Sequence, residues 1–84
     1  MSNNESKNFR PICDIAKEIK ENWKNIYFGA EPYLEAMMKL NSIDDYYYLD
    51  SADLIIRYFL VNAAYWRGEV ARRIKKELNQ MLEG

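Results

Sequence analysis

The chain has 84 residues, of which 49% are hydrophobic, 30% charged and 14% aromatic, and its formal net charge is −1. This length accommodates one hydrophobic core, and the composition is that of a globular protein rather than a disordered one. Histidine is absent and Cys13 is the single cysteine, which excludes the commonest general base, an intrachain disulfide and a thiolate metal cluster. We therefore expect no enzyme, no metal site and no cofactor.

The first ten residues are polar and lack the apolar core of a secretory signal. We expect residues 1 to 10 to be a flexible tail and residues 11 to 84 to be a single helical domain. The longest apolar run covers residues 54 to 66, but Arg57 and Asn62 interrupt it and it is too short to cross a bilayer. These features predict a cytoplasmic protein without a membrane partner.

The first helix is predicted from one apolar stripe at steps of three and four residues, formed by Ile12, Ile15, Ala16, Ile19, Trp23 and Ile26. This stripe predicts a helix over residues 11 to 27, which Gly29 ends. Pro32 suits the first turn of a second helix over residues 31 to 41. That second helix carries Glu31 and Glu35, whereas the recognition helix of a helix-turn-helix is basic, so we reject that motif for residues 12 to 40.

The third helix follows a polar connector, residues 41 to 51, in which Asp50 or Ser51 can act as the N-cap. It is apolar on nearly every side as far as Trp66, so we expect it to be the most enclosed element. Beyond Gly68 the apolar stripe is rotated by roughly 60 to 80° on an ideal helix. Either the helix continues with a kink, which we favour, or it stops near Gly68 and restarts.

The predicted fold is therefore all-α, a small bundle of three to four helices whose last helix is long and kinked or broken near Gly68. A continuous last helix of about 31 residues would be roughly 46 Å long, more than an 84-residue domain needs. An overhanging end could pack on a second copy. We therefore also expect a homodimer.

The connector contains the sequence DDYYYLD, and its candidate partner-binding residues are Asp44, Asp45, Tyr46, Tyr47 and Tyr48. Three successive tyrosine rings cannot all face one core, so at least one should be exposed. Exposed tyrosine beside acidic residues is typical of a protein-binding hot spot, and the acidic residues would repel phosphate. Alternatively, two of the rings cover the bundle and the third has no role.

The C-terminal part is basic, since residues 54 to 84 hold six basic and three acidic side chains. The candidates for binding nucleic acid are Arg72, Arg73, Lys75 and Lys76. On a helical wheel most of them lie away from the apolar stripe, where they could contact phosphates. The alternative is a solvated face on which Glu69 and Glu77 neutralise the neighbouring arginines at helical spacing.

Three segments carry a resemblance to a protein family: PYLEAM at 32 to 37, DS at 50 to 51, and YFLVNAAYWRGEVARRIKKEL at 58 to 78. From Ile15 to Leu82 the chain resembles small helical proteins encoded by phages and prophages of Gram-positive bacteria. The resemblance implies a mobile-element origin and a short cytoplasmic chain that acts on host or phage machinery. It supplies no catalytic residues.

Together these features favour a non-enzymatic interaction protein of phage origin. It would cover a surface of a host or phage protein, for example as an anti-CRISPR-like inhibitor of a host defence system. The alternative is a nucleic-acid-binding accessory protein that uses the basic C-terminal helix.

Overall fold

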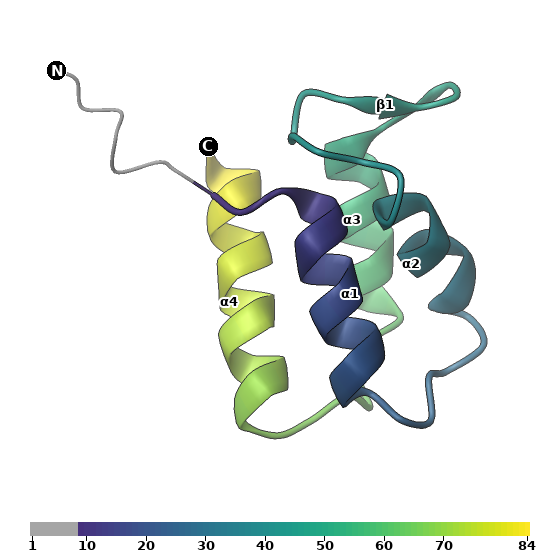
Figure 1. The fold of residues 1–84 in the computed structure, drawn as a ribbon, viewed down its shortest axis with the longest axis vertical. Coiled ribbons are helices and arrows are strands. Elements are labelled where there is room, and N and C mark those ends of the chain that lie inside the picture. Colours follow the sequence, from purple (N-terminus) through teal and green to yellow (C-terminus); the bar gives the residue numbers. More distant parts are fainter. Residues whose placement is uncertain (1–8) are drawn as a thin grey trace, which may run out of the picture.

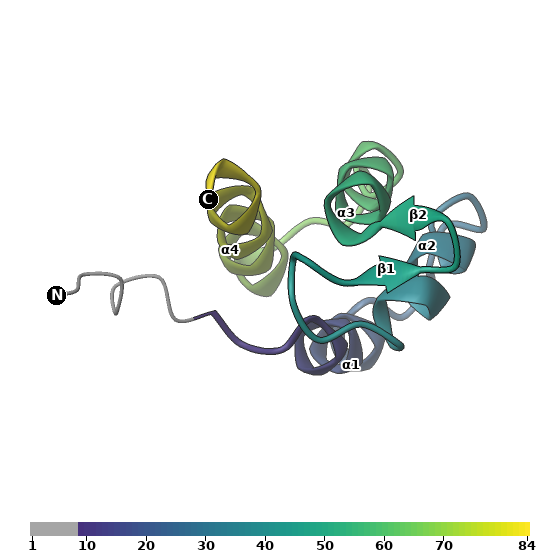
Figure 2. The same cartoon turned by 90° about the horizontal axis from the view of Figure 1, so that it is seen from above.

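The computed structural model describes residues 9 to 84 of the chain. This part forms helices α1 (Ile12–Asn22), α2 (Glu31–Met37), α3 (Ala52–Val61) and α4 (Glu69–Glu83), with strands β1 (Tyr46–Tyr47) and β2 (Asp50–Ser51) between α2 and α3. Successive helices run in opposite directions (Figure 1). The α1–α2 and α3–α4 loops therefore share one end of the bundle, and the strand pair covers the other end (Figure 2).

The core is apolar and is built from all four helices. Its largest fully buried side chains are Ile12, Ile15, Ile19, Leu34, Met37, Leu40, Ile56, Phe59, Ile74 and Leu78. The predicted stripe of the first helix faces this core from Ile12 to Ile19. The prediction of a helical bundle is confirmed, but a purely all-α fold is not, because residues 46 to 51 form an antiparallel strand pair.

The first helix ends at Asn22, five residues before the predicted end at 27. Trp23 leaves the helix with φ −87° and ψ 99° and stays buried at the base of the bundle. The Oδ1 atom of Asn22 accepts a hydrogen bond from Nε1 of Trp66 at 2.8 Å. Tertiary contacts at this end thus override a periodicity that alone would extend the helix.

The second helix is also shorter than predicted, because it ends at Met37 and a tight turn follows. This turn directs two carbonyls toward the start of α1. The N–H of Ile12 donates to the carbonyl of Asn41 at 2.9 Å, and the N–H of Cys13 donates to that of Leu40 at 2.8 Å. Two of the amide groups that a helix leaves unsatisfied at its first turn are thereby paired.

The favoured continuous helix through Gly68 is wrong, and the alternative of a break is confirmed. α3 ends at Val61, the chain turns over residues 62 to 68, and α4 returns antiparallel to α3. Gly68 precedes α4 with φ 112° and ψ −179°, a conformation essentially restricted to glycine. The rotated stripe therefore belongs to two helices facing one core, and the long rod that suggested a homodimer does not exist.

The third helix is not the enclosed element that its composition predicted. Ile55, Ile56 and Phe59 face the core, but Tyr58 and Val61 on the opposite side are exposed. Arg57 pairs with Asp53 one turn away, and Nδ2 of Asn62 donates to the carbonyl of Tyr58 at 2.9 Å. α3 consequently presents an apolar face to solvent.

A flexible tail was expected over residues 1 to 10. Residues 1 to 8 of it lie outside the described part of the chain, and residues 9 and 10 lie within it. Phe9 packs against the core, and the Arg10 guanidinium pairs with Glu18 at 2.9 Å and with Glu77 at 2.8 Å. Within residues 9 to 84, none of the helices has the length and apolar character needed to cross a membrane.

Candidate protein-binding face

The connector forms a short hairpin whose two-residue turn is Tyr48-Leu49. Tyr46 pairs with Ser51 and Tyr47 pairs with Asp50. Tyr48 has a φ of 57°, which L side chains rarely adopt and which glycine usually supplies at such turns. Tyr48 is 85% exposed and Leu49 is 94% exposed. We call these two residues the hairpin tip.

The base of the hairpin is held by Asp45. Its carboxylate accepts backbone N–H groups of Asn41 at 2.9 Å and Ser42 at 3.0 Å, and its carbonyl accepts the N–H of Ala52 at 2.9 Å. The N–H bonds from Ser42 and Asn41 hold the pKa of Asp45 below its ordinary value. Asp45 is therefore a structural residue of the connector, whereas the side chain of Asp44 is exposed.

The three successive tyrosines do not all face the core, as predicted, and only one of them packs against it rather than the two of the alternative. Tyr47 is partly buried and packs against the core, while Tyr46 and Tyr48 are exposed. The rings of Tyr47 and Tyr48 meet edge to face, with centroids 4.7 Å apart. The inner tyrosine therefore supports the exposed one.

Below the hairpin, α2 and α3 enclose a pocket of about 290 Å³. It is lined by Pro32, Tyr33, Ala36, Tyr47, Asp50, Leu54, Ile55 and Tyr58. The rings of Tyr33 and Tyr58 lie 5.6 Å apart with 33° between their planes, so one wall of the pocket is aromatic.

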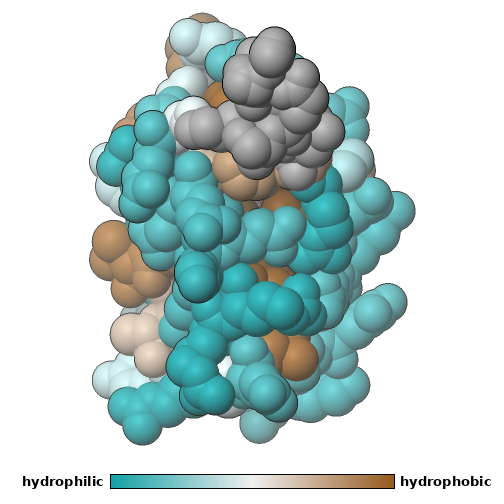
Figure 3. Space-filling model, turned by 90° about the vertical axis from the view of Figure 1, so that its left-hand side faces the viewer, coloured by the Kyte–Doolittle hydropathy of each residue, from teal (hydrophilic) through white to brown (hydrophobic). Residues whose placement is uncertain are grey.

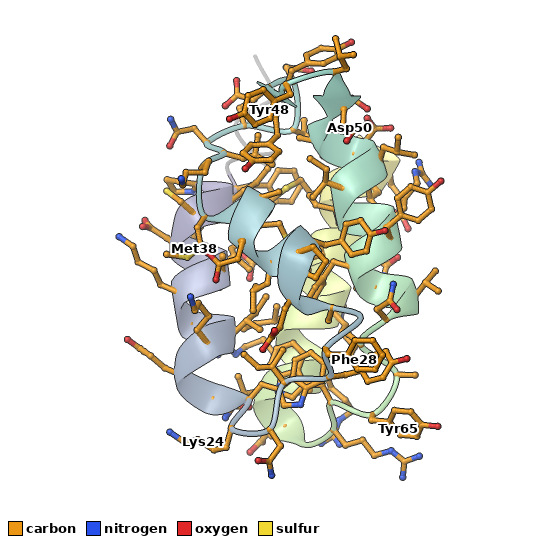
Figure 4. The ribbon with its side chains drawn as sticks, turned by 90° about the vertical axis from the view of Figure 1, so that its right-hand side faces the viewer. Lys24, Phe28, Met38, Tyr48, Asp50 and Tyr65 are labelled. Atoms are coloured by element: carbon orange, nitrogen blue, oxygen red, sulfur yellow. The ribbon has the colours of Figure 1, made fainter. Side chains whose placement is uncertain are left out.

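The apolar surface continues along α3 to the other end of the bundle. Phe28 is 77% exposed and Tyr65 is 78% exposed, and the ring of Tyr27 contacts both of them. In Figure 4, Tyr48 and Asp50 lie at one end of this side of the molecule, and Phe28 and Tyr65 lie at the other end. We call the surface between the two ends the aromatic face; it consists of Tyr27, Phe28, Tyr33, Leu54, Tyr58, Val61 and Tyr65.

The residues of the aromatic face were not predicted as a site, because apolar residues at helical spacing were assigned to the core. One signal was present in the sequence. Leu54, Tyr58 and Val61 follow the spacing i, i+4, i+7 and form a second stripe beside that of Ile55 and Phe59. A helix with two apolar stripes has one stripe more than a small bundle can bury.

The four basic candidates on α4 do not form one free surface. Arg73 pairs with Glu18 of α1. Lys75 donates from Nζ to the carbonyl of Trp66 at 2.7 Å, and burial holds its pKa below the ordinary value. Arg72 and Lys76 are exposed.

The predicted partners of these cations also differ from the observed ones. Glu77 pairs with Arg10, and Arg73 pairs with Glu18 rather than with Glu69 or Glu77. The ion pairs therefore link α4 to α1 and to the N-terminal segment rather than neighbouring turns of one helix. Figure 3 shows that the face of the molecule on the side of α4 is mostly hydrophilic.

Among residues 9 to 84, no group of three histidine, cysteine or acidic side chains is arranged to hold a metal ion. Comparison of the chain with protein-family models, with curated proteins and with solved structures finds no match.

Proposed function

We propose that this chain is a non-enzymatic interaction protein that covers a surface of a partner protein with its aromatic face and hairpin tip. The observation that carries the proposal is the hairpin tip, where Tyr48 and Leu49 are almost fully exposed. Folding gains little from exposed apolar side chains, and a tyrosine at positive φ costs backbone energy. Rigid exposed aromatic side chains are typical anchors of protein interfaces.

The charges around this surface indicate the kind of partner. Asp44 and Asp50 are exposed on the connector, and Glu31 is exposed at the start of α2. These acidic residues favour a partner with a basic surface and disfavour contact with phosphate, whereas Lys24 and Arg67 line a pocket with Tyr65 at the other end of the aromatic face. A nucleic-acid-binding effector of host defence has such a surface, and the resemblance to phage proteins supports the same partner class. We infer an inhibitor that occludes it.

The alternative, direct binding of nucleic acid by α4, has less support. Arg73 and Lys75 are engaged within the domain, which leaves Arg72 and Lys76 as exposed candidates. Two cations on one helix are a weak phosphate-binding site.

The test is affinity capture from infected host cells, after nuclease treatment, with three forms of the protein. The first is the wild type, the second carries Tyr48→Gly and Leu49→Ser, and the third carries Arg72→Gln and Lys76→Gln. We expect one partner protein to be retained by the wild type and the α4 variant and lost by the tip variant. With the purified partner, the tip variant should bind about tenfold more weakly or worse.

Two results would contradict the proposal. The first is a partner that the tip variant retains and the α4 variant loses. The second is a salt-dependent shift of DNA or RNA by the wild type that the α4 variant abolishes, since that result assigns binding to the basic helix.

A further inference from the structure

We propose that the pocket between α2, α3 and the hairpin binds an arginine side chain of the partner protein. This inference rests on the proposed function and specifies the chemistry that the partner presents. The pocket volume of about 290 Å³ is at the small end of the range for ligand sites, so it suits a single side chain better than a whole cofactor.

The pocket is rich in tyrosine. Tyr33 of α2, Tyr47 of β1 and Tyr58 of α3 come from three elements and line the same cavity. Tyrosine rings carry negative charge density on their faces and attract cations within about 6 Å of the ring centroid. Three tyrosines around one cavity form an arrangement that favours an organic cation over an uncharged group.

Asp50 also lines the pocket and brings an acidic side chain to its edge. Its position is set by the hairpin, because Asp50 pairs with Tyr47 across the two strands. Among residues 9 to 84 no cation forms an ion pair with Asp50, and the nearby Arg57 pairs with Asp53 instead. A negative charge beside three aromatic rings therefore lacks a counter-charge from the domain itself.

The lining of the pocket suits arginine better than lysine. The pocket is also lined by Pro32, Ala36 and Leu54, which can contact the methylene groups of a long side chain. A planar guanidinium stacks on aromatic rings and donates two parallel hydrogen bonds to one carboxylate. An ammonium group cannot do both, so arginine should bind more tightly than lysine.

The probe for this inference is N-acetyl-arginine-methylamide, titrated into the full chain and followed by NMR chemical shifts. Its neutral isostere, the citrulline derivative, is the control ligand, and the lysine derivative tests the preference. We expect saturable shifts at the pocket residues with the arginine derivative, weaker binding of the lysine derivative and no saturable shifts with citrulline. Equal responses to arginine and citrulline, or none to arginine, would overturn the inference.

Variants assign the binding to the pocket. Asp50→Asn should weaken binding of the arginine derivative by roughly two- to fivefold, since the carboxylate is exposed. Asp44→Asn removes the same charge from the same connector outside the pocket and should leave the affinity unchanged. Tyr58→Leu should weaken binding by a similar factor while Tyr58→Phe retains it, because phenylalanine keeps the aromatic face.

If Asp44→Asn and Asp50→Asn have equal effects, the pocket is not the site. Two other outcomes separate this inference from the proposed function. If the partner is lost by the tip variant but the pocket does not bind the arginine derivative, only the inference is contradicted. Arginine binding at the pocket together with a partner held by α4 contradicts only the proposed function.

Discussion

The indole rings of Trp23 and Trp66 stack with their centroids 5.6 Å apart and 13° between their planes. Trp23 begins the loop after α1, and Trp66 lies in the loop before α4. The stack therefore joins the two loops at the base of the bundle. The Phe59 ring meets both indoles edge to face, which connects the stack to the core.

The hydrogen bond from Trp66 to Asn22, beside this stack, should make a measurable contribution to the stability of the domain. Trp66→Phe removes the N–H that donates to Asn22, and Asn22→Ala removes the acceptor. Because Asn22→Ala deletes a partly buried hydrogen bond, we expect it to lower the free energy of unfolding by about 1 to 2 kcal/mol in urea denaturation. Trp66→Phe also removes part of the buried, stacked indole and should cost more. The double variant should cost less than the two single losses together; strictly additive losses would show that the bond does not contribute.

Gly68 is required for its backbone conformation and not for space, because a Cβ built there has no neighbour within 4 Å. Gly68→Ala should lower the free energy of unfolding by roughly 1 to 3 kcal/mol, the cost of such a conformation for an L-residue. Thermal unfolding of a synthetic chain with D-alanine at this position is the control, since D-residues favour positive φ and should restore most of the loss. Unchanged stability of Gly68→Ala would mean that the turn has another conformation.

Much of the fold was predictable because it depends on local periodicity. The buried stripe of α1 follows from apolar spacing, and the helical start near Glu31 follows from Pro32. α3 begins after Ser51, one of the two predicted cap residues, although its side chain makes no capping hydrogen bond. Local periodicity could not distinguish a break at Gly68 from a kink, because both are compatible with the same rotation of the apolar stripe. The decision depends on Trp66, which packs against Trp23 from a distant part of the chain.

The candidate site was predictable only in part. An exposed tyrosine in the connector follows from three successive rings, but the positive φ of Tyr48 depends on the strand pairing that encloses the turn. The aromatic face depends on which side of α3 the other helices cover. The ion pairs of α4 were predicted wrongly for a similar reason. The packing of α1 on α4 places Glu18 beside Arg73, and the spacing of residues within α4 does not indicate this contact.

Glu18 should make the stability of the domain sensitive to acid. Hydrogen bonds first from Arg73 and then from Arg10 lower its pKa in the folded state. A carboxyl group whose folded pKa is depressed stabilises the protein above its unfolded pKa, about 4.3 for glutamate, and this stabilisation is lost as the pH falls through the folded value. Glu18→Gln should therefore reduce stability at pH 7 and flatten its decline below about pH 4.3.

The matched control for this prediction is Glu21→Gln on the exposed side of the same helix. Glu21 forms no ion pair within residues 9 to 84, so this variant should follow the wild-type pH profile of urea midpoints. If Glu18→Gln and Glu21→Gln gave equal pH profiles of the urea midpoint, Glu18 would not be a source of the acid sensitivity.

Tyr48 should show a conflict between stability and binding, because its side chain is exposed while its φ of 57° suits glycine. Tyr48→Ala and Tyr48→Gly both remove the ring, but only glycine relieves the backbone. We expect the glycine variant to be more stable than the alanine variant by about 1 kcal/mol in urea denaturation, and at least as stable as the wild type.

Both Tyr48 variants should nevertheless lose the partner that the wild type retains, since the ring is the proposed anchor. A glycine variant that is stable and inactive separates the two roles, because its loss of binding cannot result from unfolding. If the glycine variant binds as tightly as the wild type, the aromatic ring is not the anchor. If glycine and alanine give equal stability, the turn does not hold Tyr48 at positive φ in solution. Stable folding with lost binding is the outcome that the exposed, strained tyrosine predicts.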